Sequence, residues 1–478
     1  MPSDSFLPLR FPEGFWWGNA SAGHQVEGDN VHSNWWAWEQ LGKVNDGTRS
    51  GRACDYWNRH AEDHALMRAL GMNALRLGVE WARTEPAEGR PDEAALAHYR
   101  TLLEDARRNG LRICLTLNHW VLPQWLAEQG GWEAPRALEA WEAQVRRVVR
   151  AAGDLVDLWV TLNEPMVPVL AGYVAGYHPP CRVAPLAAAR VFERLLRAHA
   201  IAYRVIHESL SRAPDGGAVM AGFAGAYQLV EPFHESGLRH ALEKPLARAI
   251  ERGSFGAWDR SVATGRVAAP YGLGRAISGL AGSVDFVGVN YYTRISARLG
   301  LDTISNVKSG GHACPPGLER TEMGWQVYPP GFFHVLDLVR RTFGKPIWIT
   351  ENGCADSGDD ARRRYLLSHL AQVHRAIAAG CDVRGYLHWA FTDNFEWREG
   401  FEKKLGIVAM DHEDPELRRT PRQSAFLLRD VARANAVTPE IVHAHGPGAL
   451  DPWPLAPDSR GAAPAPADAA SGRRTFRP

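Results

Sequence analysis

Two glutamates lie near the ends of apolar segments that are far apart in the chain. Glu164 follows the segment L-W-V-T-L-N, and Glu351 follows P-I-W-I-T. If both segments are strands of one parallel barrel, the two carboxylates face one opening, because the loops after the strands converge there. Retaining glycoside hydrolysis uses such a pair about 5 Å apart, one as nucleophile and one as proton donor. A lone glutamate at a strand end is more often solvated or salt-bridged, so its context has to decide.

Eight short apolar segments alternate with helix-like stretches, which predicts an α/β protein of parallel strand–helix units. The predicted strands are four to eight residues long and begin near Phe15, Ala74, Arg112, Leu158, Ala218, Asp285, Pro346 and Gly385. Clear amphipathic stretches cover residues 56–70, 93–109, 137–152, 191–210 and 361–379. Eight strands favour a single (β/α)8 TIM barrel with its active site at the C-terminal ends of the strands. A doubly wound open sheet uses the same units and is the alternative.

Glycines and composition mark the boundaries of this domain. Gly71, Gly110, Gly344 and Gly380 stand where a predicted helix meets the next strand, and glycine adopts the left-handed C-cap conformation without a Cβ clash. From about residue 444 the chain is rich in Pro, Ala, Gly and Asp and has no periodic apolar face. We therefore predict a barrel over residues 1–443 and a flexible tail over residues 444–478.

Composition excludes several classes of function. The 54 basic and 54 acidic side chains cancel, so the whole chain attracts neither nucleic acid nor an anionic membrane, although a local charged patch is compatible with this balance. Six cysteines without a C-x-x-C pair predict reduced thiols. No H-E-x-x-H, phosphate loop or G-x-S-x-G elbow occurs, so we expect neither a metal nor a cofactor. The N-terminal residues lack a signal-peptide pattern, which favours a cytoplasmic protein.

The motifs around the two glutamates resemble those of a known family. T-L-N-E-P and I-T-E-N-G, in this order, resemble the two signature motifs of glycoside hydrolase family 1, and the similarity extends over about residues 11–435, including D-N-F-E-W. This resemblance implies that Glu164 is the acid/base and that Glu351 is the nucleophile of a glycosyl-enzyme intermediate. Relatives that cleave thioglycosides replace the acid/base by an amide, whereas here both carboxylates are intact.

The resemblance also implies roles for neighbouring residues. Arg76 and Tyr292 would hydrogen-bond the nucleophile, and Asn163 would stand beside the acid/base. Taken alone, each of these polar or aromatic residues is more often structural, but their joint occurrence favours a sugar site. The implied sugar-binding residues are Gln25, His119, Asn163, Asn290, Glu396 and Trp397, with Trp389 as the platform under the sugar and Trp325 beside the leaving group.

These residues favour a retaining exo-β-glycosidase that acts by double displacement on a small β-glycoside. We expect a β-glucosidase with β-galactosidase or β-fucosidase activity. Relatives that act on 6-phospho-β-glycosides replace the carboxylate at the position of Glu396 and carry a lysine and a tyrosine that bind the phosphate. Here Glu396 is retained and Leu405 stands at the tyrosine position, although Lys403 fits the lysine position. A 6-phospho-β-glycosidase is therefore disfavoured. Transglycosylation and noncatalytic glycan binding are further alternatives. His24 and Asn118 stand where aromatic residues are common in the family, which leaves the preferred sugar open. The oligomeric state is open as well.

Overall fold

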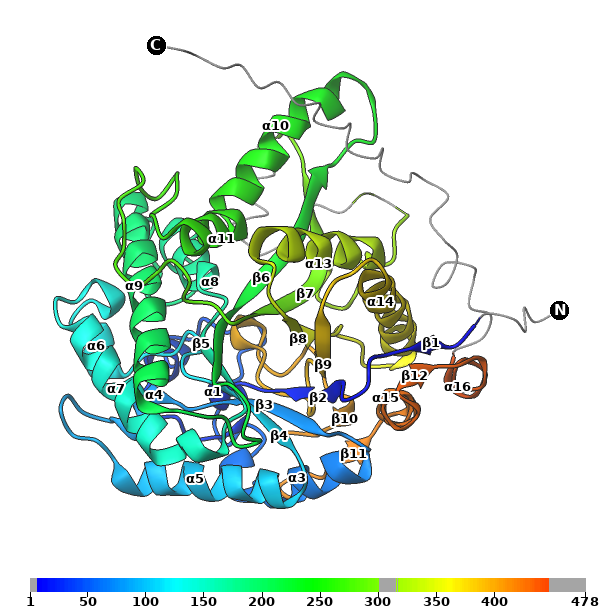
Figure 1. Ribbon diagram of the computed structural model, residues 1–478, viewed down its shortest axis with the longest axis horizontal. Coiled ribbons are helices and arrows are strands. Elements are labelled where there is room, and N and C mark those ends of the chain that lie inside the picture. The colour runs from blue at the N-terminus through cyan, green and yellow to red at the C-terminus, as the bar shows by residue number, and fades with distance from the viewer. Residues whose placement is uncertain (1–6, 301–314, 316, 447–478) are drawn as a thin grey trace, which may run out of the picture.

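The computed structural model describes residues 7–300, 315 and 317–446. Its centre is a closed barrel of eight parallel strands that follow one another around the barrel in chain order, with β2 paired to β9 (Figure 1). The strands are β2 (Trp16–Ala20), β3 (Ala74–Gly78), β4 (Arg112–Thr116), β5 (Leu158–Asn163), β6 (Met220–Pro232), β7 (Phe286–Ala297), β8 (Ile347–Asn352) and β9 (Val383–His388). This closure confirms the predicted TIM barrel and rules out the doubly wound sheet.

Two strands are longer than the sequence pattern predicts. β6 has 13 residues and β7 has 12, so the predicted length of four to eight residues is wrong for both. Their C-terminal halves pair with each other as far as Pro232 and Ala297. Because side chains there are largely half-exposed and include charged residues, these halves lack the continuous apolar run from which strands were predicted.

Helices surround the barrel and cover its outer face (Figure 1). The long helices are α3 (Tyr56–Ala69), α5 (Glu93–Arg108), α7 (Ala137–Ala152), α9 (Pro185–Ser209), α10 (Gly237–Gly253), α11 (Phe255–Thr264), α13 (Pro329–Phe343), α14 (Asp360–Ala378) and α15 (Gln423–Ala434). The short ones are α1 (Gly23–Val26), α2 (Asn34–Glu39), α4 (Trp81–Thr84), α6 (Gln124–Glu128), α8 (Met166–Val169) and α16 (Pro439–His445). α9 begins six residues before its predicted start, with Pro185 in its first turn. The four predicted C-cap glycines all have positive φ.

The strands bury both of their faces. Along β3, Leu75 and Leu77 belong to the apolar layer between the barrel and its helices, whereas Ala74 belongs to the cluster inside the barrel. That inner cluster is closed by aromatic rings, with Trp348 lying 5.7 Å from Trp16 between ring centroids. The barrel interior is therefore a packed core, and space for a substrate has to come from the loops at its mouth.

The ends of the described chain lie side by side. β1 (Leu9–Arg10) pairs antiparallel with β12 (Ala436–Val437), and a second small ladder joins β10 (Val408–Ala409) to β11 (Thr420–Pro421). α16 continues to His445, just past the predicted start of the tail, and residues 447–478 of that tail lie outside the described residues.

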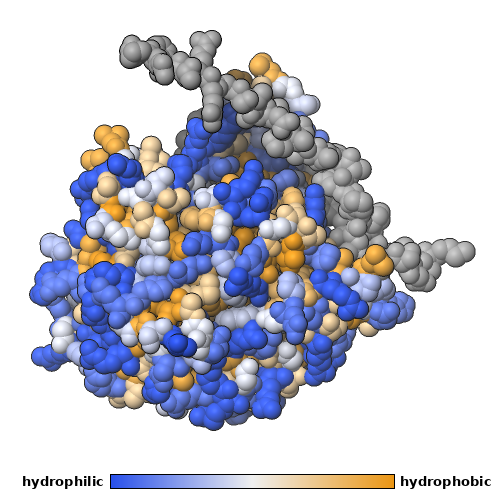
Figure 2. All heavy atoms as spheres, viewed as in Figure 1, coloured by the Kyte–Doolittle hydropathy of each residue, from blue (hydrophilic) through white to orange (hydrophobic). Residues whose placement is uncertain are grey.

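Hydrophilic residues dominate the face of the molecule seen in Figure 2, with apolar side chains scattered among them. No helix within the described ranges has the length and hydropathy of a membrane span. The cysteines in these ranges, which exclude Cys314, are free thiols: Cys54, Cys114, Cys181, Cys354 and Cys381.

Candidate active site

An irregularity in β5 directs its last residues into the barrel mouth. Val160 lies opposite Gly222 of β6, but Asn163 lies opposite Ala224, so β5 uses three residues where β6 uses two. Such an extra residue breaks the strict alternation of side chains and re-aims those that follow. Asn163 and the adjacent Glu164 therefore reach the site together.

β8 carries the second glutamate past a similar irregularity. Ile349 lies opposite Val289 of β7, and the next paired position joins Glu351 to Asn290, which leaves Thr350 as the extra residue. The Thr350 hydroxyl donates a 2.6 Å hydrogen bond to the side-chain oxygen of Asn290. Both predicted catalytic glutamates thus follow a bulge that turns the chain toward the mouth.

Both carboxylate oxygens of Glu351 accept strong hydrogen bonds. Arg76 Nη1 donates to Oε1 at 2.6 Å, and the Tyr292 hydroxyl donates to Oε2 at 2.7 Å. Arg76 is fully buried because β3 directs it inward with Ala74. A buried guanidinium and a phenol favour the ionised carboxylate, as expected for a nucleophile.

Glu164 is held in a strained backbone conformation. Its φ of 43° lies in the left-handed region, which is costly for a residue with a Cβ. Its N–H donates to the Ala224 carbonyl at 2.7 Å, and its Oε1 accepts from Asn290 Nδ2 at 2.9 Å. Its side chain has no cationic hydrogen-bond partner, in contrast to that of Glu351.

Asn163 links the surroundings of the two glutamates. Its Oδ1 accepts from Arg76 Nη2 at 2.6 Å and from Asn290 Nδ2 at 3.0 Å. Its Nδ2 lies 2.8 Å from His119 Nε2, which must therefore act as the acceptor and place the ring proton on Nδ1. Burial and the charge of Arg76 hold the pKa of His119 well below its usual value, so this ring is neutral.

The two glutamates differ in the groups that raise or lower the pKa of each carboxyl. Burial and the negative charge of Glu351 raise the pKa of Glu164 to about 8. Burial also raises the pKa of Glu351, but the Arg76 charge and the Tyr292 hydrogen bond oppose that rise. The Arg76 charge opposes the rise in pKa at both groups but contacts only Glu351, so these surroundings favour the proton on Glu164.

Gln25 and Glu396 form a polar wall of the site. Gln25, in α1 after β2, donates from Nε2 to Glu396 Oε2 at 3.1 Å and to the Phe395 carbonyl at 2.9 Å. Its Oε1 is buried and has no partner within the protein. Burial and the charge of Glu351 raise the pKa of Glu396 to about 8, although hydrogen bonds from Gln25 and Trp389 oppose this rise. Gln25 Oε1 is therefore a free acceptor for a ligand hydroxyl.

Trp397 packs at the centre of an aromatic cluster in the same wall. Its ring centroid lies 4.6 Å from those of Trp35 and Trp120, and 5.7 Å from that of His119. On another side it stacks at 5.8 Å on His24, whose Nε2 lies 2.7 Å from a Glu39 carboxylate. Trp397 is thus a fixed support of the wall.

The two other predicted tryptophans flank this arrangement. Trp389, directly after β9, lies 5.9 Å from His119 between ring centroids. Trp325 is half-buried and lies 5.4 Å from Tyr292, on the side of the site that contains Glu351. The structure therefore brings every predicted site residue to one end of the barrel.

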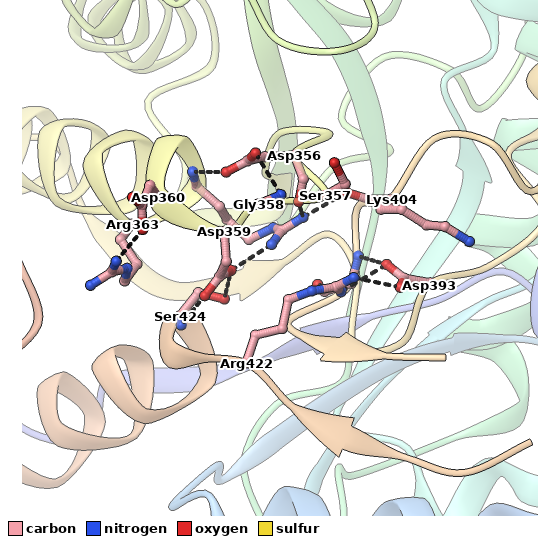
Figure 3. Close-up of polar contacts among 12 residues, drawn as sticks. Asp356, Ser357, Gly358, Asp359, Asp360, Arg363, Asp393, Lys404, Arg422 and Ser424 are labelled. Carbon is pink, nitrogen blue, oxygen red and sulfur yellow. Dashed lines mark hydrogen bonds and ion pairs between the residues drawn. The ribbon is translucent and has the colours of Figure 1, made fainter. Parts of the chain in front are cut away.

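A buried ion pair supports the segment D-N-F-E-W that carries Glu396. Figure 3 shows Arg422 pointing at Asp393, which begins this segment; its two guanidinium nitrogens donate at 3.0 and 2.8 Å. Asp393 also accepts from the backbone N–H groups of Gly406 and Met410. These contacts attach the segment to the start of α15 and to the residues on either side of β10.

Comparison with known proteins agrees with this geometry. The model of Glycosyl hydrolase family 1 matches residues 8–437. The chain belongs to this family. It is 32% identical to β-glucosidase A of Thermotoga maritima over 90% of this chain and 99% of that protein. It is 30% identical to a β-galactosidase of Pyrococcus woesei over 90% and 98%.

A solved β-glycosidase of Pyrococcus horikoshii has a similar structure, with a TM-score of 0.82 and 33% identity over 92% of this chain and 99% of the other. The protein is therefore a glycosidase of family 1. In the part of the chain that the structure describes, no group of three or more His, Cys, Asp or Glu side chains could hold a metal ion.

Sequence reasoning missed several residues of this family 1 site. Trp120 has a buried indole nitrogen without a protein partner. Its position directly after His119 in the N-H-W segment could have identified it as a site residue. Thr116 and Thr350 accept or donate hydrogen bonds within the Arg76–Asn290 network. Nothing in the sequence distinguishes these threonines from ordinary strand residues.

Proposed function

We propose that this glycosidase hydrolyses β-glycosides with retention of anomeric configuration. One observation carries the proposal: the two glutamates at the mouth have different hydrogen-bond partners and neighbouring charges. Glu351 has Arg76 and Tyr292 on its two oxygens, whereas Glu164 has an anionic neighbour and a pKa of about 8. A retaining site needs this combination of an ionised nucleophile and a protonated acid.

In the first step, Glu351 attacks the anomeric carbon while Glu164 gives its proton to the departing oxygen. The glycosidic C–O bond breaks, and an ester forms between the sugar and Glu351. Once Glu351 is an ester, its negative charge no longer raises the pKa of Glu164. Glu164 is then a stronger acid whose carboxylate takes a proton from the attacking water, and hydrolysis of the ester restores both groups.

The substrate we propose is an unphosphorylated β-glucoside, with β-galactosides and β-fucosides also accepted. Gln25 Oε1 and His119 Nδ1 are buried polar atoms without protein partners, which suits the hydroxyls of a terminal sugar. A phosphate beside Glu396 would raise the already elevated pKa of that carboxyl further, and the buried Leu405 offers no hydrogen bond to a phosphate. The names of the relatives, β-glucosidase and β-galactosidase, agree with this substrate class.

The test compares wild type, Glu164→Gln and Glu351→Ala on nitrophenyl β-glycosides and their 6-phospho forms, with the product anomer followed by proton NMR. We expect the β-anomer to appear first, no activity in Glu351→Ala, and slow turnover in Glu164→Gln. Initial release of the α-anomer would refute double displacement. Activity on phosphorylated substrates alone would favour a 6-phospho-β-glycosidase, and a folded wild type that cleaves none of them would favour glycan binding.

A further inference from the structure

The loop between α2 and α3 is attached to the turn that follows Glu396. In this loop, Asp46 accepts hydrogen bonds through Oδ2 from the backbone N–H groups of Phe401 at 2.8 Å and Glu402 at 3.1 Å. Its Oδ1 accepts from the N–H and the hydroxyl of Thr48 at 2.9 and 2.6 Å. Four donors thus fix the carboxylate of Asp46 between two segments that are about 350 residues apart in the chain.

Two neighbouring residues of the loop strengthen this attachment. The N–H of Asn45 donates to the carbonyl of Arg398 at 2.7 Å, and its side-chain amide donates to the carboxylate of Glu399 at 2.9 Å. Val44 is buried in the cluster that contains Trp397. The loop therefore holds both halves of the turn and the aromatic support beneath it.

The turn itself transmits this attachment to Glu396. Glu396 is the N-cap of the 3-10 helix η4 (Trp397–Glu399), and its N–H donates to the carbonyl of Gly400 at 2.7 Å. Gly400 has a φ of 70°, and a Cβ there would collide with the carboxylate of Asp46. The backbone of Glu396 therefore bonds to a residue that packs directly against Asp46 and has no room for a side chain.

We propose that Asp46 is a positioning residue for sugar recognition. It holds Glu396 in its place in the polar wall of the site. This rests on the proposed function, and it takes Glu396 to lie near carbon six of the bound sugar, because relatives that act on 6-phosphoglycosides replace this residue. Asp46→Ala removes the protein acceptor of the Phe401 and Glu402 N–H groups, so water replaces it and the turn loses the contact that fixes its position. Glu351 and Glu164 lie on other elements and keep their contacts.

The experiment measures kcat and KM of wild type, Asp46→Ala and Asp46→Asn on nitrophenyl β-glucoside and on its 6-deoxy analogue. The matched control is Asp215→Ala, because Asp215 also accepts a backbone N–H in an exposed turn, at the opposite end of the barrel. We expect Asp46→Ala to lower kcat/KM for the glucoside about tenfold, mainly through KM, and to leave the deoxy substrate nearly unchanged. Asp46→Asn should fall between, and the control should match wild type.

Equal losses on both substrates, or an unchanged preference in folded Asp46→Ala, would overturn the positioning role, because a merely structural residue affects both substrates alike. If wild type cleaves neither substrate, the proposed function fails instead. Titration of wild type and Asp46→Ala with glucose and 6-deoxyglucose, followed by tryptophan fluorescence, then decides the role of Asp46. An unchanged ratio of the two affinities would again overturn it.

Discussion

Replacing Arg76 by methionine should move the acidic limb of the pH–activity profile upward. Arg76 and Glu351 have side chains that are 0% and 5% exposed, and their contact at 2.6 Å joins two charges away from water. Removal of one partner of such a pair costs about 3 kcal/mol or more if the other stays charged. At about 1.4 kcal/mol per pKa unit, Glu351 instead takes up a proton at a pH roughly two units higher than in wild type.

The expected consequence is a loss of nucleophile at the wild-type optimum. One unit above the wild-type pKa, a two-unit shift leaves about one tenth of Glu351 ionised, so kcat/KM falls about tenfold there. The loss approaches about a hundredfold at lower pH, and activity recovers as pH rises further. The assay is kcat/KM against pH on nitrophenyl β-glucoside. Tyr292→Phe, which removes one neutral hydrogen bond, should shift the limb in the same direction by less.

A matched control separates this effect from damage to the fold. Arg362 is also fully buried and pairs with Asp359, but it lies outside the active site. Arg362→Met should lower the thermal midpoint as much as Arg76→Met does and leave the acidic limb in place. If folded Arg76→Met shows the wild-type limb, the guanidinium does not set the ionisation of Glu351, and the reasoning from burial is refuted.

Three further predictions concern the proton, the backbone and the support of the site. Because Glu164 must be protonated and its pKa is about 8, kcat/KM should decline as pH rises through that value, and Glu164→Gln should lose this limb. Gly353→Ala should lower kcat/KM about tenfold or more, since its Cβ would collide with the carbonyl of Trp389; circular dichroism checks folding. Arg422→Met should lower the free energy of unfolding by about 3 kcal/mol in urea titrations by leaving Asp393 buried and unpaired, and an unchanged midpoint would contradict this.

The barrel could be predicted from sequence because its strands and helices carry strong local signals. β8 is a short apolar run that ends in a polar residue, and glycines such as Gly344 mark the ends of helices. The outer halves of β6 and β7 could not be predicted, since their pairing beyond the barrel depends on each other and on no apolar run.

The sequence predicted that these residues lie at one end of the barrel, but it did not predict the geometry in which they meet. The positions of Glu164 and Glu351 at the ends of predicted strands placed both at the mouth. The bulge at Thr350 adds one residue that nothing in the composition marks. Asp46 stands in V-N-D-G-T, which is typical of any surface turn, and the segment it holds is far away in the chain. Long-range contacts of this kind become visible only in three dimensions.

The pairing of β1 with β12 bears on how the molecule can be re-engineered. Leu9 lies opposite Val437, and Trp17 donates to the side chain of Asn435 at 2.9 Å, so the two ends of the folded chain are already joined by hydrogen bonds. β1 precedes β2, which places this ladder at the end of the barrel away from the catalytic mouth. A short linker could therefore connect the two ends in a circular permutant, with new termini opened in an exposed loop and the substrate entrance left clear.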